Sequence, residues 1–285
     1  MKKEKVTLTI SQFPKELRIY TEKATLYDSS SHSGATVLYL DTGYYLKIDQ
    51  KGKLAWEAQC AKWFDKQGLG VPVLTYISQD RDYLLTKEAS GISGLKVLDQ
   101  PEVLCQTMAT ALRQLHSLQP KHFPVNSPLQ NYIKTAKENY HKGLFYKKAL
   151  LPQFQIRSRE EAYHLIQKLG YLLTEEVFIH GDACLPNFIF NDASHFSCFI
   201  DVGLSGFSDR HIDLYWAIWS LTYNLGNPKY GDLFLDYYGR ENINSEKLRL
   251  IAAFEAFGWH LLSPWLSKGK SWKLQKLKRK SGFIS

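Results

Sequence analysis

Two polar residues stand five positions apart between apolar flanks in VFIHGDACLPNFIF, residues 177–190. They are Asp182 and Asn187, and the flanks 177–179 and 188–190 have the apolar character of buried strands. A carboxylate beside a core costs free energy unless it has a partner or a chemical task. A carboxylate can take the proton of a hydroxyl group, and an amide oxygen can bind a hard metal ion. The spacing therefore indicates a loop that orients a hydroxyl nucleophile beside a metal-bound anion.

A second acid follows Asn187 by fourteen residues, in the segment SCFIDVG. This residue is Asp201, and Gly203 after it would let the backbone turn sharply beside an ion. An aspartate and an asparagine are suitable oxygen ligands for Mg²⁺ that bridges the phosphates of a nucleotide. The D-x-x-x-x-N spacing followed by D-x-G is typical of phosphoryl-transfer sites.

Two more candidates lie upstream. Lys47 occurs in the predicted strand YYLKID, and Glu57 occurs in the segment KLAWEAQCAKWFDKQ, whose apolar spacing predicts a helix. A strand lysine that contacts phosphates and is held by a helix glutamate recurs in phosphoryl-transfer enzymes. Either residue alone is weak evidence, because exposed lysines on strands and solvated glutamates on helices are common. Together with the downstream residues they predict a nucleotide-binding site.

The elements that must position these residues change character near residue 90. Before it, strands are predicted at 35–40 and 44–49, and a second pair lies on either side of the turn SQDR, with the helix 53–67 between the two pairs. After SGISG, helices are predicted at 101–118, about 127–140, 158–173, 211–225, 229–238 and 245–262. The pattern predicts an α+β, two-lobed fold. We expect a β-rich nucleotide-binding lobe at 1–90, a helical lobe with the catalytic loop and the substrate site at 91–266, and a basic tail at 267–285.

Charge and composition limit the kinds of binding partner that the chain can have. The net charge is +8, and the tail 267–285 carries seven Lys or Arg and no acid, which leaves about +1 for the rest of the chain. A protein that binds nucleic acid or an anionic surface would have to rely on that tail. No apolar run approaches the roughly 20 residues of a membrane span, and no signal peptide is evident. The four cysteines show no paired spacing, so free thiols and a cytoplasmic location are expected.

Four segments carry a resemblance to a known family. HGDACLPN, FIDVGLSGFSDRHIDL, LLTKEASG and LHSL resemble the aminoglycoside phosphotransferases of the 3′ type, which are small-molecule kinases with a protein-kinase-like fold. The resemblance covers roughly residues 20–262. It implies that Asp182 is the catalytic base and that Asn187 and Asp201 hold Mg²⁺.

The resemblance also implies how ATP, or GTP, is bound. Lys47, positioned by Glu57, would contact the phosphates, and Ser33 with its neighbours would cover them. The segment from Lys87 to Ala89 would be the hinge that meets the base through its backbone. The phosphate loop DSSSHSGATV departs from the family, since Gly34 is its only glycine.

The acceptor side departs further from the family. The segment 134–159 has seven Lys or Arg and only one acid, where the family usually supplies carboxylates to a cationic substrate. Glu255 and Asp209 are the tentative substrate residues, although Asp209 has scaffold as its alternative role. We therefore expect weak affinity for kanamycin-like polycations. A kinase for a neutral or anionic acceptor, such as a sugar or nucleoside, is the alternative function. A less favoured alternative is a binding protein that uses its basic tail.

Overall fold

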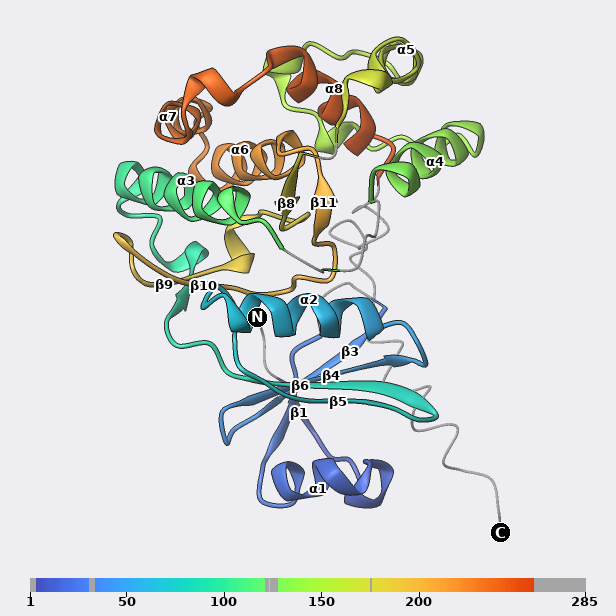
Figure 1. The fold of residues 1–285 in the computed structure, drawn as a ribbon, viewed down its shortest axis with the longest axis vertical. Helices are drawn as coiled ribbons and strands as arrows, with labels where there is room; N and C mark the ends of the chain where they lie inside the picture. The colour runs from blue at the N-terminus through green and yellow to red at the C-terminus, as the bar shows by residue number, and fades with distance from the viewer. Residues whose placement is uncertain (1–3, 31–33, 121–122, 124–127, 175, 259–285) are drawn as a thin grey trace.

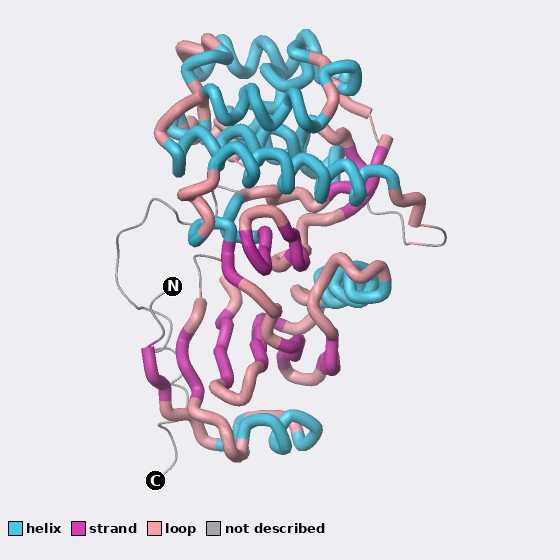
Figure 2. The backbone as a smooth tube through the Cα atoms, turned by 90° about the vertical axis from the view of Figure 1, so that its left-hand side faces the viewer, coloured by secondary structure: helices cyan, strands magenta, loops and turns pink. Residues whose placement is uncertain are grey.

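The computed structural model describes residues 4–30, 34–120, 123, 128–174 and 176–258. Ser33 and the tail 267–285 therefore lie outside the described residues. The chain forms a lower lobe built on a sheet and an upper lobe built mainly of helices (Figure 1). Figure 2 shows the same separation from the side, with the sheet strands below and almost only helices at the top. No helix among the described residues is both long and apolar enough to cross a membrane.

The lower lobe contains one antiparallel sheet of six strands. Their order across the sheet is β1-β2-β3-β4-β6-β5. The bounds are β1 Glu4–Val6, β2 Leu26–Asp28, β3 Thr36–Leu40, β4 Tyr44–Gln50, β5 Val73–Ser78 and β6 Arg81–Lys87. The two predicted strand pairs are present as β3–β4 and β5–β6.

The two faces of this sheet have different partners. Side chains alternate along a strand, so Leu46 and Lys47 point to opposite faces. Leu46 is fully buried in a cluster with Leu38, Leu85 and Leu17, and Leu17 belongs to helix α1 (Lys15–Thr21) below the sheet. The opposite face, which carries Lys47, is turned toward helix α2 and the upper lobe (Figure 1).

Helix α2 (Ala55–Lys66) lies between the sheet and the helical lobe (Figure 1). Its residue Ala58 is buried with Leu84 of β6, whereas Cys60 and Phe64 belong to the core of the upper lobe. The ring centroid of Phe64 lies 6.1 Å from that of Phe178, and Trp63 lies 4.5 Å from Phe178. The predicted lobe 1–90 thus contributes half of one helix to the other core.

The upper lobe combines helices with two small sheets, ordered β10-β9-β7 and β11-β8. Its helices are α3 Pro101–Ser117, α4 Pro128–His141, α5 Arg159–Leu169, α6 His211–Leu225, α7 Lys229–Tyr238 and α8 Ser245–Glu255. Its strands are β7 Ile92–Ser93, β8 Val177–Ile179, β9 Phe188–Asp192, β10 His195–Phe199 and β11 Gly206–Ser208. Short 3₁₀ helices connect them, namely η2 Gly94–Lys96, η3 Lys147–Ala149, η4 Pro152–Phe154, η5 Gly170–Leu172, η6 Leu185–Asn187 and η7 Arg240–Asn242.

The helices of the upper lobe were predictable from the sequence, whereas one of its strand pairings was not. All six expected helices are present, and the described part of the last one ends at Glu255 rather than at 262. The apolar segment 188–190, which has the character of a strand in the sequence, is present in β9 and pairs with β10. The pairing of β8 with β11 was not predicted, because three-residue strands leave no periodic pattern in a sequence.

Candidate active site

The loop that carries Asp182 and Asn187, the candidate catalytic loop, connects β8 to β9 through η6. Asn187 is buried at the end of this loop, and its side-chain Nδ2 donates to the backbone oxygen of Asp182 at 2.9 Å. The backbone oxygen of Asn187 accepts the N–H of Ile200 at 3.0 Å, one residue before Asp201. These bonds fix the orientation of the Asn187 amide and bring Asp182, Asn187 and Asp201 into one neighbourhood.

A buried acid of α6 (His211–Leu225) anchors the start of the loop. Asp213 in α6 is fully buried and accepts the backbone N–H groups of His180 and Gly181, each at 2.8 Å. His116 Nε2 lies 3.0 Å from the same carboxylate. Burial alone would raise the pKa of Asp213, but the hydrogen bond and charge of His116 outweigh it and lower the pKa. Asp213 therefore holds the loop as a carboxylate, a role that follows from no local sequence signal other than the DRHIDL resemblance.

His180 and Gly181 stabilise the conformation of the loop. His180 Nε2 donates to the Ile200 oxygen at 3.0 Å, and its Nδ1 accepts the N–H of Asp182 at 3.1 Å, so both ring nitrogens are engaged. Gly181 has a φ of +85°, and a Cβ there would lie 2.3 Å from the backbone oxygen of Leu204. A side chain at position 181 would therefore strain the backbone and collide with the opposite loop.

Lys47 of β4, Glu57 of α2 and Asp201, which follows β10, meet in one cluster. Lys47 Nζ lies 2.7 Å from Glu57 Oε1 and 3.0 Å from Asp201 Oδ1. Burial alone would lower the pKa of Lys47, but the carboxylates of Asp201 and Glu57 outweigh it and raise the pKa. Lys47 is thus a permanent cation. Lys47 and Glu57 are ten residues apart, whereas Asp201 lies 154 residues beyond Lys47. The pairing of Lys47 with Glu57 is the one that the resemblance implies.

Asp201 has the properties of a metal ligand. Its side chain is 46% exposed, and its φ of +59° is uncommon for a residue other than glycine. Gly203 approaches Glu57 so closely that a Cβ would lie 3.1 Å from Glu57 Oε2. Asp201 and Asn187 together offer hard oxygen ligands from one side, and Mg²⁺ is usually bound by one or two carboxylates with substrate phosphates completing its shell. The donor set therefore fits Mg²⁺.

Two tyrosines that the sequence analysis did not single out line the same face of the sheet as Lys47. Tyr45 precedes Lys47 by two residues and therefore shares its face, and Tyr39 pairs with it across β3 and β4. Their ring centroids are 5.1 Å apart, and Tyr39 Oη donates to Glu88 Oε2 at 3.1 Å. The period-2 alternation counted back from Lys47 was the signal that would have found Tyr45.

The predicted hinge follows β6. The N–H of Lys87 donates to Pro72, and the N–H of Glu88 donates to Gly43, both at 2.9 Å. Among the residues that the structure describes, none accepts the N–H of Ala89. The hinge therefore presents backbone at Ala89, beside the tyrosine-lined face, as the predicted contact with a base requires.

The two tentative substrate acids are placed differently from the expectation. Asp209 is 0% exposed and is bound by Lys247 at 2.8 Å and by His211 Nδ1 at 2.6 Å. Burial alone would raise its pKa, but the hydrogen bonds from His211 and Lys247 lower it. Glu255 is also 0% exposed, and it accepts from Tyr132 Oη at 2.7 Å and from Trp216 Nε1 at 2.9 Å.

Neither Asp209 nor Glu255 therefore reaches a surface where a ligand could touch it. Apart from His211, the partners named above lie 38 to 123 residues away from these acids in the sequence, which is why local pattern did not separate a buried acid from a substrate contact. Asp209 supports the scaffold, its alternative role in the sequence analysis.

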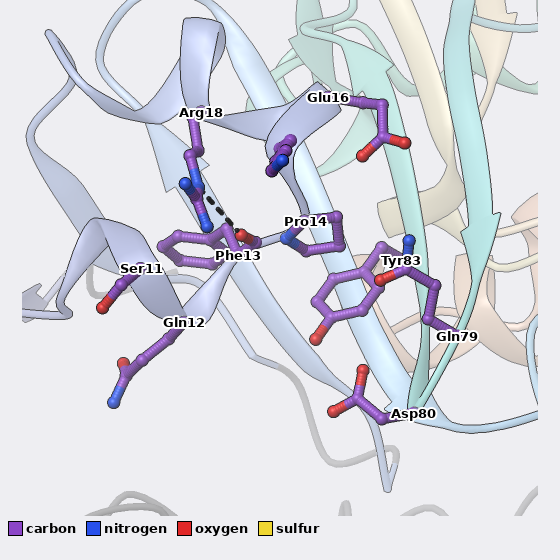
Figure 3. A pocket seen from close by; sticks show the side chains of 10 residues that line it. Ser11, Gln12, Phe13, Pro14, Glu16, Arg18, Gln79, Asp80 and Tyr83 are labelled. Atoms are coloured by element: carbon purple, nitrogen blue, oxygen red, sulfur yellow. Dashed lines mark hydrogen bonds between the residues drawn. The ribbon is translucent and has the colours of Figure 1, made fainter.

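A pocket of about 450 Å³ lies elsewhere, on the outer side of the sheet lobe (Figure 3). Residues of η1 (Ile10–Gln12), α1 and the β5–β6 turn line it, including Phe13, Asp80 and Tyr83. Tyr83 is paired with Ile48, one residue from Lys47, so the pocket belongs to the sheet face opposite the one that carries Lys47. It does not contain the residues of the candidate active site.

Known proteins resemble this chain over most of its length. The sequence pattern of the phosphotransferase enzyme family matches residues 28–251. A probable aminoglycoside 3′-phosphotransferase of Lactococcus lactis subsp. lactis (strain IL1403) is 37% identical over 263 residues, which are 90% of this chain and 98% of the relative. An aminoglycoside 3′-phosphotransferase of Niallia circulans is 30% identical over 205 residues, 70% of this chain and 77% of the relative.

Solved structures agree on the fold. The aminoglycoside phosphotransferase of Streptomyces rimosus ATCC10970 superposes with a TM-score of 0.70 at 21% identity, covering 89% of this chain and 100% of that chain. The structure of the same protein in complex with ADP and streptomycin superposes with a TM-score of 0.63, also at 21% identity, covering 79% of this chain and 90% of that chain. The two-lobed, kinase-like architecture is therefore shared.

Proposed function

Because this chain belongs to the phosphotransferase enzyme family, we propose that it transfers the γ-phosphoryl group of ATP to a hydroxyl group of an aminoglycoside. The observation that carries the proposal is the convergence of Lys47, Asp201 and the Asp182–Asn187 loop through direct contacts. The names of the relatives from Lactococcus lactis and Niallia circulans supply the acceptor class.

In this proposal the residues of the candidate active site have separate tasks. Asp182 orients the acceptor hydroxyl and takes its proton as the oxygen attacks phosphorus. Lys47, fixed by Glu57, binds the phosphates, and Asn187 with Asp201 would hold Mg²⁺. When bound, Mg²⁺ neutralises charge on the phosphates.

The nucleotide base would be held at the hinge. Ala89 offers its backbone N–H, and Tyr45 and Tyr39 form an aromatic wall on the sheet face beside it. Lys87 lies at the end of β6, where it leads into the hinge, and Ser33 would cover the phosphates. This arrangement accepts ATP, and GTP is the alternative donor. A cytoplasmic location is part of the proposal, because nucleoside triphosphates are supplied there.

A second acceptor class is favoured by one observation. The segment 134–159 carries seven Lys or Arg against Glu138 alone, and the ion pairs of Glu138 with Lys134 and Lys142 are long, at 4.0 and 3.8 Å. Positive charge on this segment would repel a polycation and attract an anion. A neutral or anionic metabolite, such as a sugar or a nucleoside, is therefore the alternative acceptor.

The test is a turnover assay with purified protein, ATP and MgCl₂. Kanamycin, streptomycin, a neutral disaccharide and a nucleoside serve as acceptors, and the phosphorylated product is identified by mass spectrometry. Asp182→Asn is the matched control, and we expect it to lower kcat by about 10²-fold or more with little change in ATP affinity. Phosphorylation of the sugar or nucleoside alone would replace the aminoglycoside proposal, and turnover that survives in Asp182→Asn would contradict the assigned base.

A further inference from the structure

Helix α6 carries three aromatic residues on one face. Trp216, Trp219 and Tyr223 follow one another at spacings of three and four residues, which places them on a common side of the helix. The ring centroids of Trp216 and Trp219 are 5.6 Å apart. Those of Trp219 and Tyr223 are 5.0 Å apart with an interplanar angle of 6°, so these two rings are stacked. We call this set the aromatic ladder.

The inner end of the aromatic ladder is anchored and its outer end is open to solvent. Trp216 is 5% exposed, and its Nε1 donates to the buried carboxylate of Glu255 at 2.9 Å. Tyr223 is 65% exposed, although one of its faces is covered by Trp219. An exposed large aromatic ring held in a fixed orientation by a second ring is a ready stacking surface.

The aromatic ladder lies beside the catalytic loop. Ser220, which follows Trp219, accepts the N–H of Leu185 at 2.9 Å through its Oγ. The Sγ of Cys184 lies 4.0 Å from the backbone oxygen of Trp216, and Cys184 follows the proposed base by two residues. On the other side, Trp219 Nε1 donates to the backbone oxygen of Lys148 in η3 at 3.2 Å. The ladder thus spans from the loop that holds the base to the basic segment 134–159.

The surroundings of the aromatic ladder contain few acids. Residues 139–159 and residues 214–231 include no Asp or Glu. The one carboxylate at its inner end, Glu255, is engaged by Tyr132 and Trp216. These two described segments therefore offer a ligand no carboxylate, whereas Tyr223 offers it the face of a ring.

We propose that Tyr223, backed by Trp219, stacks on a ring of the acceptor and determines which acceptors are bound. The inference rests on the proposed function, because it concerns the acceptor of the same reaction. The ligand class is a hydroxylated ring, such as a sugar or an aminosugar, that turns its less polar face to Tyr223. A single ammonium group over the ring is also accommodated, since the face of an aromatic ring attracts cations. Glu255 is a positioning residue in this arrangement, because it acts through Trp216.

Isothermal titration calorimetry tests the proposal without turnover, with kanamycin as the probe and the full chain as the protein. We expect Tyr223→Ala to weaken binding of kanamycin about tenfold, the size of effect that loss of one aromatic contact produces. Tyr223→Phe, which keeps the ring, should bind as the parent does. Tyr171→Ala is the matched control, because Tyr171 is 77% exposed and lies in η5, outside α6.

Ionic strength supplies an independent measurement on the unmodified protein. If a stacked ring dominates, the affinity for kanamycin changes by less than about threefold between 0.05 and 0.5 M KCl, because screening acts on ion pairs. A drop of tenfold or more would overturn the proposal in favour of carboxylates. Equal affinity of Tyr223→Ala and the parent, or an equal loss in Tyr223→Phe, would overturn it as well.

The outcomes separate this inference from the proposed function. Kanamycin that binds through Tyr223 but is not phosphorylated would refute the aminoglycoside kinase and leave the stacking surface in place. If the parent and Tyr223→Ala phosphorylate kanamycin with the same KM, the aminoglycoside kinase stands and the stacking role of Tyr223 is refuted. Absence of binding to the parent protein would overturn both.

Discussion

Asp213 accepts two backbone N–H groups of the catalytic loop and the imidazole of His116 while being fully buried. We predict that Asp213→Ala lowers the free energy of unfolding by about 3 kcal/mol or more, because it leaves several buried donors without an acceptor. The same change should lower kcat at least tenfold, since the loop that carries the proposed base, Asp182, loses its support. Urea denaturation and turnover measure the two effects. Asp232→Ala on the exposed side of α7 is the control and should change stability by less than about 0.5 kcal/mol.

Asp209 and Asp213 also make the folding stability depend on pH in the acid range. The pKa of each is lowered from the ordinary value of 3.8, so each contributes stability that is present above that value and is lost as the pH falls through its folded pKa. Thermal unfolding should therefore show a steep loss of stability below about pH 4. Lys247→Met removes one partner of Asp209 and should make this acid dependence shallower. An unchanged dependence in that variant would contradict the contribution of Asp209.

Asp201 has a charge-pair role with Lys47 and a proposed metal role, and calorimetry can separate them. If Asp201 binds Mg²⁺, Asp201→Asn should weaken binding of ATP with MgCl₂ about tenfold or more and weaken binding of ATP with EDTA much less. Asp192→Asn, which changes an exposed acid of β9, is the control. Equal losses with and without the metal would assign Asp201 to the ion pair alone.

At the scale of elements, the core shared between the lobes runs through α2. Phe178 of β8 contacts Trp63 and Phe64 of α2, and both phenylalanines are fully buried. We predict that Phe178→Ala costs about 3–5 kcal/mol of stability. In hydrogen exchange it should also raise the amide exchange rates of α2 and β4. Phe234→Ala in α7 is the control, because it removes an equally buried ring that belongs to the upper lobe alone. Faster exchange confined to the upper lobe in both variants would contradict the shared core.

Elements with a repeated pattern were predictable from the sequence and short ones were not. Helices such as α3 repeat apolar residues over four turns, and the β3–β4 hairpin is bounded by a glycine with a φ of +88°. The strands β1, β7 and β11 have two or three residues, and only their partners in the sheet define them. The boundary predicted near residue 90 follows the change of element type, but burial divides α2 between the two cores, which composition does not reveal.

At the scale of the whole molecule, the distribution of charge gives a last prediction. Deleting residues 267–285 removes seven positive charges and takes the net charge from +8 to about +1. Binding to vesicles with 30% phosphatidylserine in 0.1 M salt should then fall at least tenfold, at about 1 kcal/mol per basic residue near the surface. Neutral vesicles are the control. Equal binding of both proteins to the anionic vesicles would show that the tail plays no part in it.

The residues of the candidate site were predictable to the extent that motif spacing encodes them. Asp182, Asn187 and Asp201 follow from spacing, whereas the contact of Lys47 with Asp201 joins positions 154 residues apart and depends on how the lobes meet. The aromatic ladder looked like an ordinary apolar helix in the sequence, because helical spacing alone does not tell a buried ring from an exposed one.

The division of α2 between two cores has a consequence for how such an enzyme can evolve. Glu57 approaches Lys47, at the proposed nucleotide site, from a helix whose other side is packed on Phe178 in the core of the upper lobe, where the acceptor is proposed to bind. Selection for a new antibiotic acts on residues of that lobe, and any repacking there shifts the helix that carries Glu57. Adaptation to a new acceptor should therefore bring changes in ATP affinity as a by-product, and compensating substitutions should gather along α2 rather than around the nucleotide.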